Sequence, residues 1–179
     1  MPIPHHRARR APSRARSRGQ ALAEFAIVVP IFFLVFGGIV QFAVILWGTN
    51  SLNQTARDIG RWAATQQVSP CSSIAAATFV AQADQLARTS TLIGYTAGEW
   101  STANYVSHAE NTSLPASPPA TKGIETLWTG SPGTCPPADN AATWFITIRV
   151  SHVVPIFFPF VPGNGAISTT TEFRMEPSP

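Results

Sequence analysis

Charged residues are scarce in this sequence, and the short motifs that mark the common classes of enzyme are missing from it. Asp, Glu, Lys and Arg make up only 12% of its 179 residues. There is no G-x-S-x-G, H-E-x-x-H or C-x-x-C motif and no glycine-rich phosphate loop. His108, His152, Asp84 and Asp139 are scattered as a chain of this length shows by chance. We therefore expect no enzyme, no catalytic residue, no metal site, no cofactor and no small-molecule substrate.

Cysteine is nearly absent, since Cys71 and Cys135 are the only two in the chain. Both follow a long apolar run at residues 25–47, and in an oxidising compartment we expect them to pair. In the chain-entropy model, a bridge that closes so long a loop stabilises a fold by about 4 kcal/mol. Two unpaired thiols remain the alternative, because a sequence does not show that two sulfur atoms meet.

Acidic residues are absent from residues 1–19, which hold six of the 12 basic residues. The rest of the chain carries six bases against nine acids, so the net charge of +3 comes from the N-terminus alone. A cluster of arginines can bind nucleic acid. Arginines directly before an apolar span instead follow the positive-inside rule. We expect Arg14, Arg16 and Arg18 to hold a basic leader, residues 1–19, in the cytoplasm, with no nucleic-acid partner.

Residues 25–47 contain one strongly polar side chain, Gln41. As a helix this run is about 34 Å long, enough to cross a bilayer core of about 30 Å. A cleaved signal peptide is the alternative, but its apolar core has about 7 to 15 residues and ends at an A-x-A site, which GTNSLNQT does not offer. The sequence predicts a single-pass membrane protein, with its C-terminal part outside the cytoplasm.

The helical pattern continues beyond the apolar run. Four apolar residues recur at spacings of four, three and four, and so share one stripe of a helix: Leu52, Ala56, Ile59 and Ala63. We therefore expect one rod over residues 20–67, transmembrane and then amphipathic, with a kink near Pro30. Within the span, Gly37 and Gly38 would either admit a second helix or simply face lipid.

Residues 68–179 are expected to form an extracytoplasmic head. A helix is predicted over residues 72–90, with Asp84 and Arg88 paired one turn apart. Alternating apolar and polar residues predict strands at 142–153 and 166–176. The expected fold class is α+β, with a long N-terminal helix and a head in which helices pack on one face of a small antiparallel sheet.

Two segments resemble a known family. The stretch R-G-Q-A-L-A-E-F-A-I-V-V-P, followed by the apolar span and Q-T-A-R-D-I-G-R-W-A-A, is similar to the N-terminal signature of TadE-like proteins of the tight-adherence (Flp pilus) system. The closing F-R-M-E resembles the C-terminal end of that family. The resemblance covers residues 18–67 well and roughly the last 35 residues loosely. It implies a pilin-like membrane protein, acting as a minor pilin or pseudopilin with other pilins or pilus assembly proteins as partners.

The resemblance also implies a processing site. A prepilin peptidase would cut between Gly19 and Gln20, which leaves Glu24 at position +5 and Phe25 at position +6 of the mature chain. The new amine of Gln20 could then neutralise Glu24, within one molecule or between neighbours, and so set the register of packed helices.

Alternatives to this processing remain open. Glu24 could be an interfacial acid favoured by the helix dipole. The protein could also be a membrane-anchored extracytoplasmic binding module that is neither processed nor part of a filament. A membrane-tethered enzyme is the third class, which a head pocket with converging ionisable groups would favour.

Overall fold

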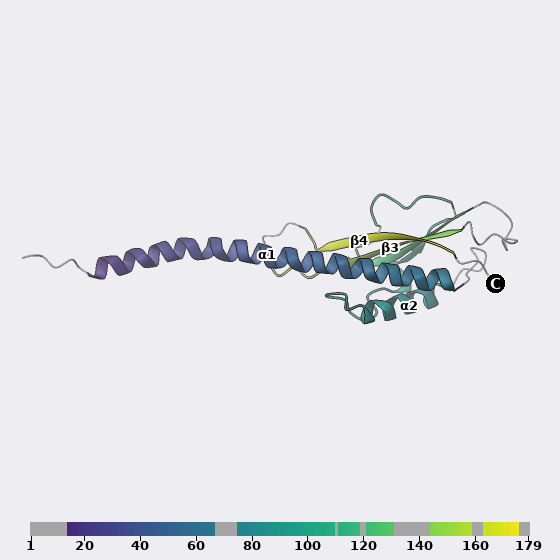
Figure 1. Cartoon of the computed structure of the whole chain (residues 1–179), viewed down its shortest axis with the longest axis horizontal. Helices are drawn as coiled ribbons and strands as arrows, with labels where there is room; N and C mark the ends of the chain where they lie inside the picture. Colours follow the sequence, from purple (N-terminus) through teal and green to yellow (C-terminus); the bar gives the residue numbers. More distant parts are fainter. Residues whose placement is uncertain are drawn as a thin grey trace, which may run out of the picture.

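The fold is a long helix whose C-terminal half carries a small α+β head (Figure 1). This computed structural model describes residues 14–66, 75–109, 111–118, 121–130, 144–158 and 163–175, with side chains described from residue 19 onward. The predicted α+β class, with a long N-terminal helix and a head of helix plus sheet, is confirmed.

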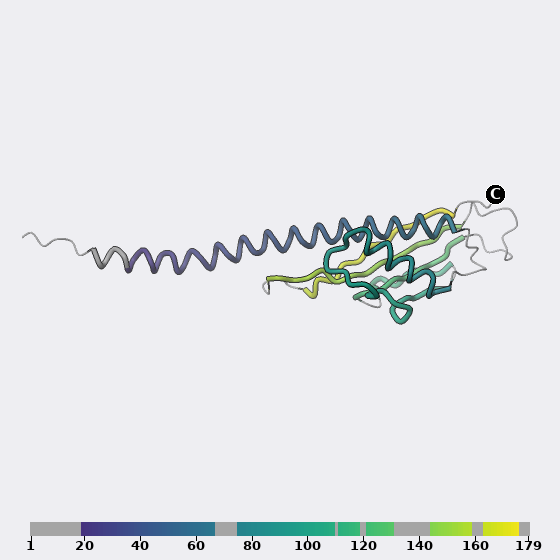
Figure 2. Tube along the Cα trace, turned by 90° about the horizontal axis from the view of Figure 1, so that it is seen from below, coloured from purple at the N-terminus to yellow at the C-terminus, as the bar shows by residue number. Residues whose placement is uncertain are grey.

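Helix α1 spans Arg14–Thr65 and has 52 residues. It begins six residues before Gln20, the expected start, because arginine is a good helix former and nothing in the intervening sequence breaks a helix strongly. The helix continues through Pro30 without interruption. Figure 2 shows α1 as one continuous, curved rod, and the kink expected near this proline stays a prediction.

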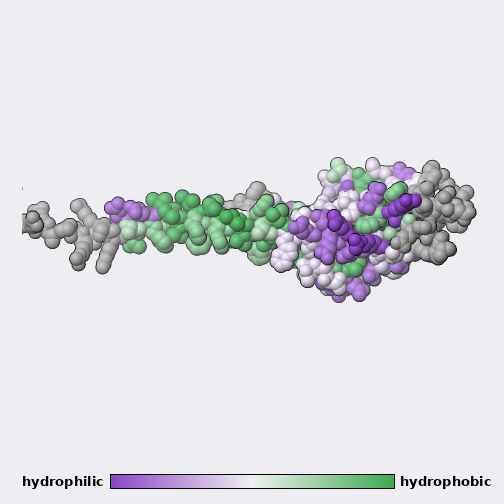
Figure 3. All heavy atoms as spheres, in the orientation of Figure 1, coloured by the Kyte–Doolittle hydropathy of each residue, from purple (hydrophilic) through white to green (hydrophobic). Residues whose placement is uncertain are grey.

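The two halves of α1 have different surroundings. In the first half, large apolar side chains from Leu22 to Trp47 are exposed around the helix, and Figure 3 shows this stretch as a continuous apolar surface. In the second half, the predicted stripe is completely buried: Leu52, Ala56, Ile59 and Ala63. One helix therefore presents an apolar surface outward and then buries an apolar stripe in the head.

Helix α2 spans Ala76–Thr89 and packs beside α1. Its buried side chains include Phe79, Val80, Ala83 and Ala87, which recur at helical spacing. The predicted pair of Asp84 and Arg88 is present as an ion pair. Amphipathic pattern and local charge together explain why this segment is helical.

Four strands form one sheet in the order β1-β2-β3-β4: β1 (Tyr105–Ser107), β2 (Gly123–Thr129), β3 (Phe145–Val153) and β4 (Ala166–Arg174). A short 3-10 helix, Thr102–Asn104, leads into β1. The pairs β2/β3 and β3/β4 are antiparallel as predicted, but the edge strand β1 runs parallel to β2. The connection over residues 108–122 is long enough to return the chain to the end of the sheet at which β1 began. The sheet is therefore mixed and not purely antiparallel.

The core lies between α1, α2 and one face of the sheet. On β3, the inward side chains Ile146, Ile148 and Val150 are completely buried and alternate with less buried neighbours. Helix α1 lies against β3 and β4, which Figures 1 and 2 both show beside its C-terminal half. Gly60 gives the Phe173 ring of β4 room to lie directly on the helix.

Truncating the buried stripe tests the contact between α1 and the sheet. Ile59→Ala should lower the free energy of unfolding by about 2–5 kcal/mol, because it leaves a cavity in a fully buried site. Arg57→Ala, on the exposed side of the same turn, should change it by less than about 0.5 kcal/mol. Denaturant titration of the full-length protein in detergent, followed by tryptophan fluorescence, measures both. Equal midpoints for the two variants would contradict the contact.

Candidate functional site: the N-terminal helix and its junction with the head

The residues of the predicted processing site lie together on the exposed start of α1. Gly19, Gln20, Glu24 and Phe25 are all exposed. The Gln20 side-chain amide donates a hydrogen bond to Glu24 Oε1 at 3.1 Å, so the two side chains lie on one face, one turn apart. A Cβ atom at Gly19 would meet nothing within 4 Å. The site is thus accessible and makes no contact with the head that a substitution would disturb.

Other predicted residues lie at the limit of the described chain or outside it. Arg14, Arg16 and Arg18 belong to the first turns of α1, where only the backbone is described. Their role in topology stays a prediction. Cys71 and Cys135 lie outside the described residues, so their pairing also stays a prediction.

Gln41 is the polar residue of the apolar run, and it is completely buried. Its Nε2 donates to the carbonyl oxygen of Pro155 at 3.1 Å, and its Oε1 accepts from the backbone N–H of Phe157 at 2.8 Å. Both ends of the amide are therefore satisfied by the segment that follows β3. The sequence alone indicated no role for this residue. Its role could have been inferred from the sequence, because a lone amide in an apolar span is costly unless it has a hydrogen-bond partner.

Gly37 and Gly38 have different neighbours. A Cβ atom at Gly37 would lie 2.5 Å from the Phe158 ring, whereas one at Gly38 would meet nothing within 4 Å. A small residue at Gly37 does permit a close approach, but the approaching group is a ring of the same chain and not another helix. Packing of a second helix at Gly38 stays a prediction.

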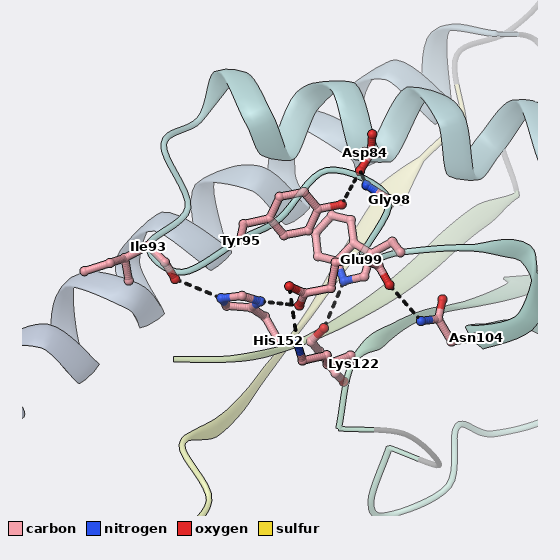
Figure 4. Close-up of polar contacts among 10 residues, drawn as sticks. Asp84, Ile93, Tyr95, Gly98, Glu99, Asn104, Lys122 and His152 are labelled. Atoms are coloured by element: carbon pink, nitrogen blue, oxygen red, sulfur yellow. Dashed lines mark hydrogen bonds and ion pairs between the residues drawn. The ribbon is translucent and has the colours of Figure 1, made fainter. Parts of the chain in front are cut away.

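Ionisable side chains converge inside the head (Figure 4). His152 of β3 is completely buried, with Nδ1 2.6 Å from Glu99 Oε1 and Nε2 2.9 Å from the carbonyl oxygen of Ile93. The second oxygen of Glu99 lies 3.5 Å from the Lys122 ammonium. A carbonyl oxygen can only accept, so Nε2 of His152 carries a hydrogen and donates it to Ile93. Both ring nitrogens therefore have partners inside the cluster.

Asp84 forms the neighbouring part of this polar network. Its Oδ1 accepts from Tyr95 Oη and from the backbone N–H of Gly98, each at 2.7 Å, and its Oδ2 pairs with Arg88. Burial acts to raise the pKa of Asp84, but these hydrogen bonds and the Arg88 charge outweigh it and hold the pKa below its ordinary value. Burial and the bond to Asp84 raise the pKa of Tyr95.

The two polar groups connect the loop after α2 to the sheet. Glu99 and Ile93 hold β3 through His152, and Gly98 and Tyr95 hold α2 through Asp84. The carboxyl of Glu99 and the ring of His152 are almost completely buried and bind each other. From the sequence, His152 and Asp84 were two of four scattered ionisable residues with no expected role, and Glu99 was missed. His152 and Glu99 are 53 residues apart, and no spacing rule connects them.

Comparison with known proteins adds one finding. Residues 19–61 match the family model of TadE-like proteins. The resemblance to TadE-like proteins is confirmed. The match begins at Gly19 and covers the exposed half of α1 together with most of its buried stripe. No curated protein and no solved structure was found to match the chain.

The TadE-like segment is also the part of the chain suited to a membrane. Among the described residues, Gly19–Thr65 is the one helix long and apolar enough to cross a bilayer. Most of its apolar part is exposed, unlike the core helix of a soluble protein. Together, the family match and this helix indicate a membrane protein associated with the Tad pilus.

Removing the Asp84 charge tests the polar network of the head. Because the folded-state pKa of Asp84 is lowered, its contribution is complete above the unfolded pKa of about 4 and is lost as pH falls through the folded value. Asp84→Asn should therefore cost about 1–3 kcal/mol near neutral pH and weaken the loss of stability in acid. Thermal unfolding in detergent from about pH 7 to about pH 3 measures this. Asp58→Asn, a half-buried carboxylate of α1, is the control, and an identical effect there would contradict the assignment.

Proposed function

We propose that this protein is a minor pilin or pseudopilin that acts in the assembly of a tight-adherence (Flp-type) pilus or a related secretion apparatus. The observation that carries the proposal is the register at the start of α1. Gly19, Glu24 and Phe25 stand at the spacing of a prepilin processing site, and the TadE-like match begins at this glycine. These residues are followed by an exposed apolar helix whose C-terminal half packs against the head.

The exposed half of α1 needs an apolar environment, since so large an apolar surface is not stable in water. In the proposed function a bilayer covers it before assembly, and helices of neighbouring subunits cover it in the filament. The N-terminus lies in the cytoplasm and the head lies outside the bacterial cell membrane. Partners are the membrane, other pilins or assembly proteins, and a prepilin peptidase. The role is structural, with no cofactor, metal or small-molecule substrate.

Glu24 has a physical reason to be part of this function. A carboxylate in the bilayer core costs about 2–3 kcal/mol on insertion scales, so in an uncut chain Glu24 stays at the headgroup level. Cleavage before Gln20 would create an amine one turn away on the same face. This amine can neutralise Glu24 in the same molecule or in a neighbour. Any axial offset between neighbouring helices that leaves either charge unpaired then costs free energy.

One observation favours the second candidate, an unprocessed membrane-anchored binding module. Helix α1 runs through the Gly19–Gln20 bond and back to Arg14, so a peptidase would have to unwind the first turns to reach the bond. Glycine lowers the cost of that unwinding, because it is a weak helix former.

Processing is tested by mass spectrometry of the N-terminus after expression with and without the peptidase. We expect a chain that begins at Gln20 only when the peptidase is present. Gly19→Leu should block the cut and leave the fold unchanged, because the space around Gly19 is open. A chain that keeps its leader, residues 1–19, in both samples would favour the unprocessed module.

The register role of Glu24 is tested by incorporation into pili. Glu24→Ala should reduce the amount of this protein in the sheared pilus fraction by more than about tenfold, because an unpaired charge in an apolar medium costs about 2–3 kcal/mol. Leu22→Ala, on the same exposed turn, is the matched control and should lower incorporation much less, because it removes apolar area and leaves no charge unpaired. Both variants should keep the parental unfolding temperature. Normal incorporation of Glu24→Ala would remove the register role even if the chain is cut.

A further inference from the structure

The segment that follows β3 leaves the head and runs along α1. Its contacts move steadily toward the N-terminal half of the helix: Val154 lies at Gly48, the Pro155 carbonyl and the Phe157 N–H bind Gln41, and Phe158 covers Gly37. Figure 2 shows this end of the β3–β4 hairpin lying beside α1, farther along the helix than the rest of the sheet.

These contacts fall inside the apolar run of α1. With Trp47 at the membrane surface, Gln41 lies about 9 Å and Gly37 about 15 Å below it, at about 1.5 Å per residue. The outer half of a hydrocarbon core of about 30 Å has the same depth, about 15 Å. On the other faces of α1 at this level, Ile39 and Phe42 are 64% and 63% exposed, so an apolar medium must reach this depth.

Residues 154–158 are themselves apolar and expose one large side chain. Val154 is buried, Ile156 and Phe158 are half-buried, and Phe157 is 62% exposed. Phe157 is thus as exposed as the apolar side chains of α1 beside it. An exposed phenylalanine within a segment that packs on a transmembrane helix indicates that the same medium covers both.

Several backbone groups of the segment have hydrogen-bond partners, which matters at membrane depth because unpaired N–H and C=O groups are costly there. The Val154 N–H donates to the Gly165 carbonyl at 2.9 Å, and Pro155 has no N–H to satisfy. Gln41 donates a hydrogen bond to the Pro155 carbonyl and accepts one from the Phe157 N–H. The one strongly polar side chain of the span therefore pairs two backbone groups of the segment that lies beside it.

We propose that residues 154–158 insert into the outer leaflet beside α1, with Phe157 facing lipid acyl chains and Gln41 acting as the clip that holds the segment on the helix. The head then meets the membrane at two points, the helix and this segment. The inference requires that α1 crosses a membrane, but it does not depend on cleavage at Gly19 or on entry into a filament.

Fluorescence quenching of the full-length protein in phosphatidylcholine nanodiscs tests the insertion. Phe157→dansylalanine should be quenched by lipids that carry a nitroxide on the acyl chain and protected from iodide in the water. The same label at Phe42, on α1 at the same depth, should behave alike, whereas a label at the exposed Thr170 of β4 should show the reverse. Quenching of position 157 by iodide to the extent seen at position 170 would overturn the proposal.

A photo-crosslinker at position 157 distinguishes lipid from protein as the group that covers this residue. Phe157→benzoylphenylalanine should gain the mass of a phospholipid, and crosslinking to a second copy of the chain without lipid adducts would overturn the proposal.

Gln41→Leu tests the clip, because it removes both hydrogen bonds and should shift the docked-to-undocked ratio at position 157 by about tenfold or more. The label at Phe42 should not respond. Unchanged quenching at position 157 in this variant would show that Gln41 is not the clip.

Discussion

The buried stripe of α1 is removed from water when the C-terminal half of this helix packs across β3 and β4. The stripe consists of Leu52, Ala56, Ile59 and Ala63. Without this burial, the sheet would expose its apolar face and α1 would be only an anchor on a tether. Two of the four are alanines, and Gly60 lies between them, so helix and sheet come close enough for the Phe173 ring to lie on the helix. The close packing makes helix and head one body, so any force or placement that the membrane imposes on the helix is passed to the head.

The same helix changes its surroundings part-way along, and Gln41 lies where this happens. From Gly37 toward the N-terminus, the helix surface becomes apolar and exposed, and from Gly48 onward one side of the helix packs against the head. A polar side chain in this zone costs free energy unless it is fully hydrogen-bonded. Here both ends of the amide bind the chain after β3, which turns a costly residue into a specific link between span and head.

Inside the head, ion pairs and hydrogen bonds to charged groups hold the loop that follows α2. The chain around Glu99 and Tyr95 has little regular structure of its own, and it is held by His152 from β3 and by Asp84 from α2. Each buried charge has a partner of opposite sign or several hydrogen-bond donors, so its desolvation is offset. Such an arrangement fixes one loop conformation more sharply than apolar contacts do, because any other conformation leaves a charge unpaired.

The sequence was sufficient to predict the features that depend on periodicity within one segment. These are the long helix with its apolar and amphipathic halves, the buried stripe, α2 with its Asp84–Arg88 pair, and strands β3 and β4. The register of Gly19, Glu24 and Phe25 is likewise local. Three features are contacts between residues far apart in the chain. They are the parallel pairing of the edge strand β1 with β2, the pairing of His152 with Glu99, and the packing of residues 154–158 against Gly37 and Gln41. Only the tertiary structure decided these, because long-range pairing depends on which surfaces remain uncovered once the local elements have packed.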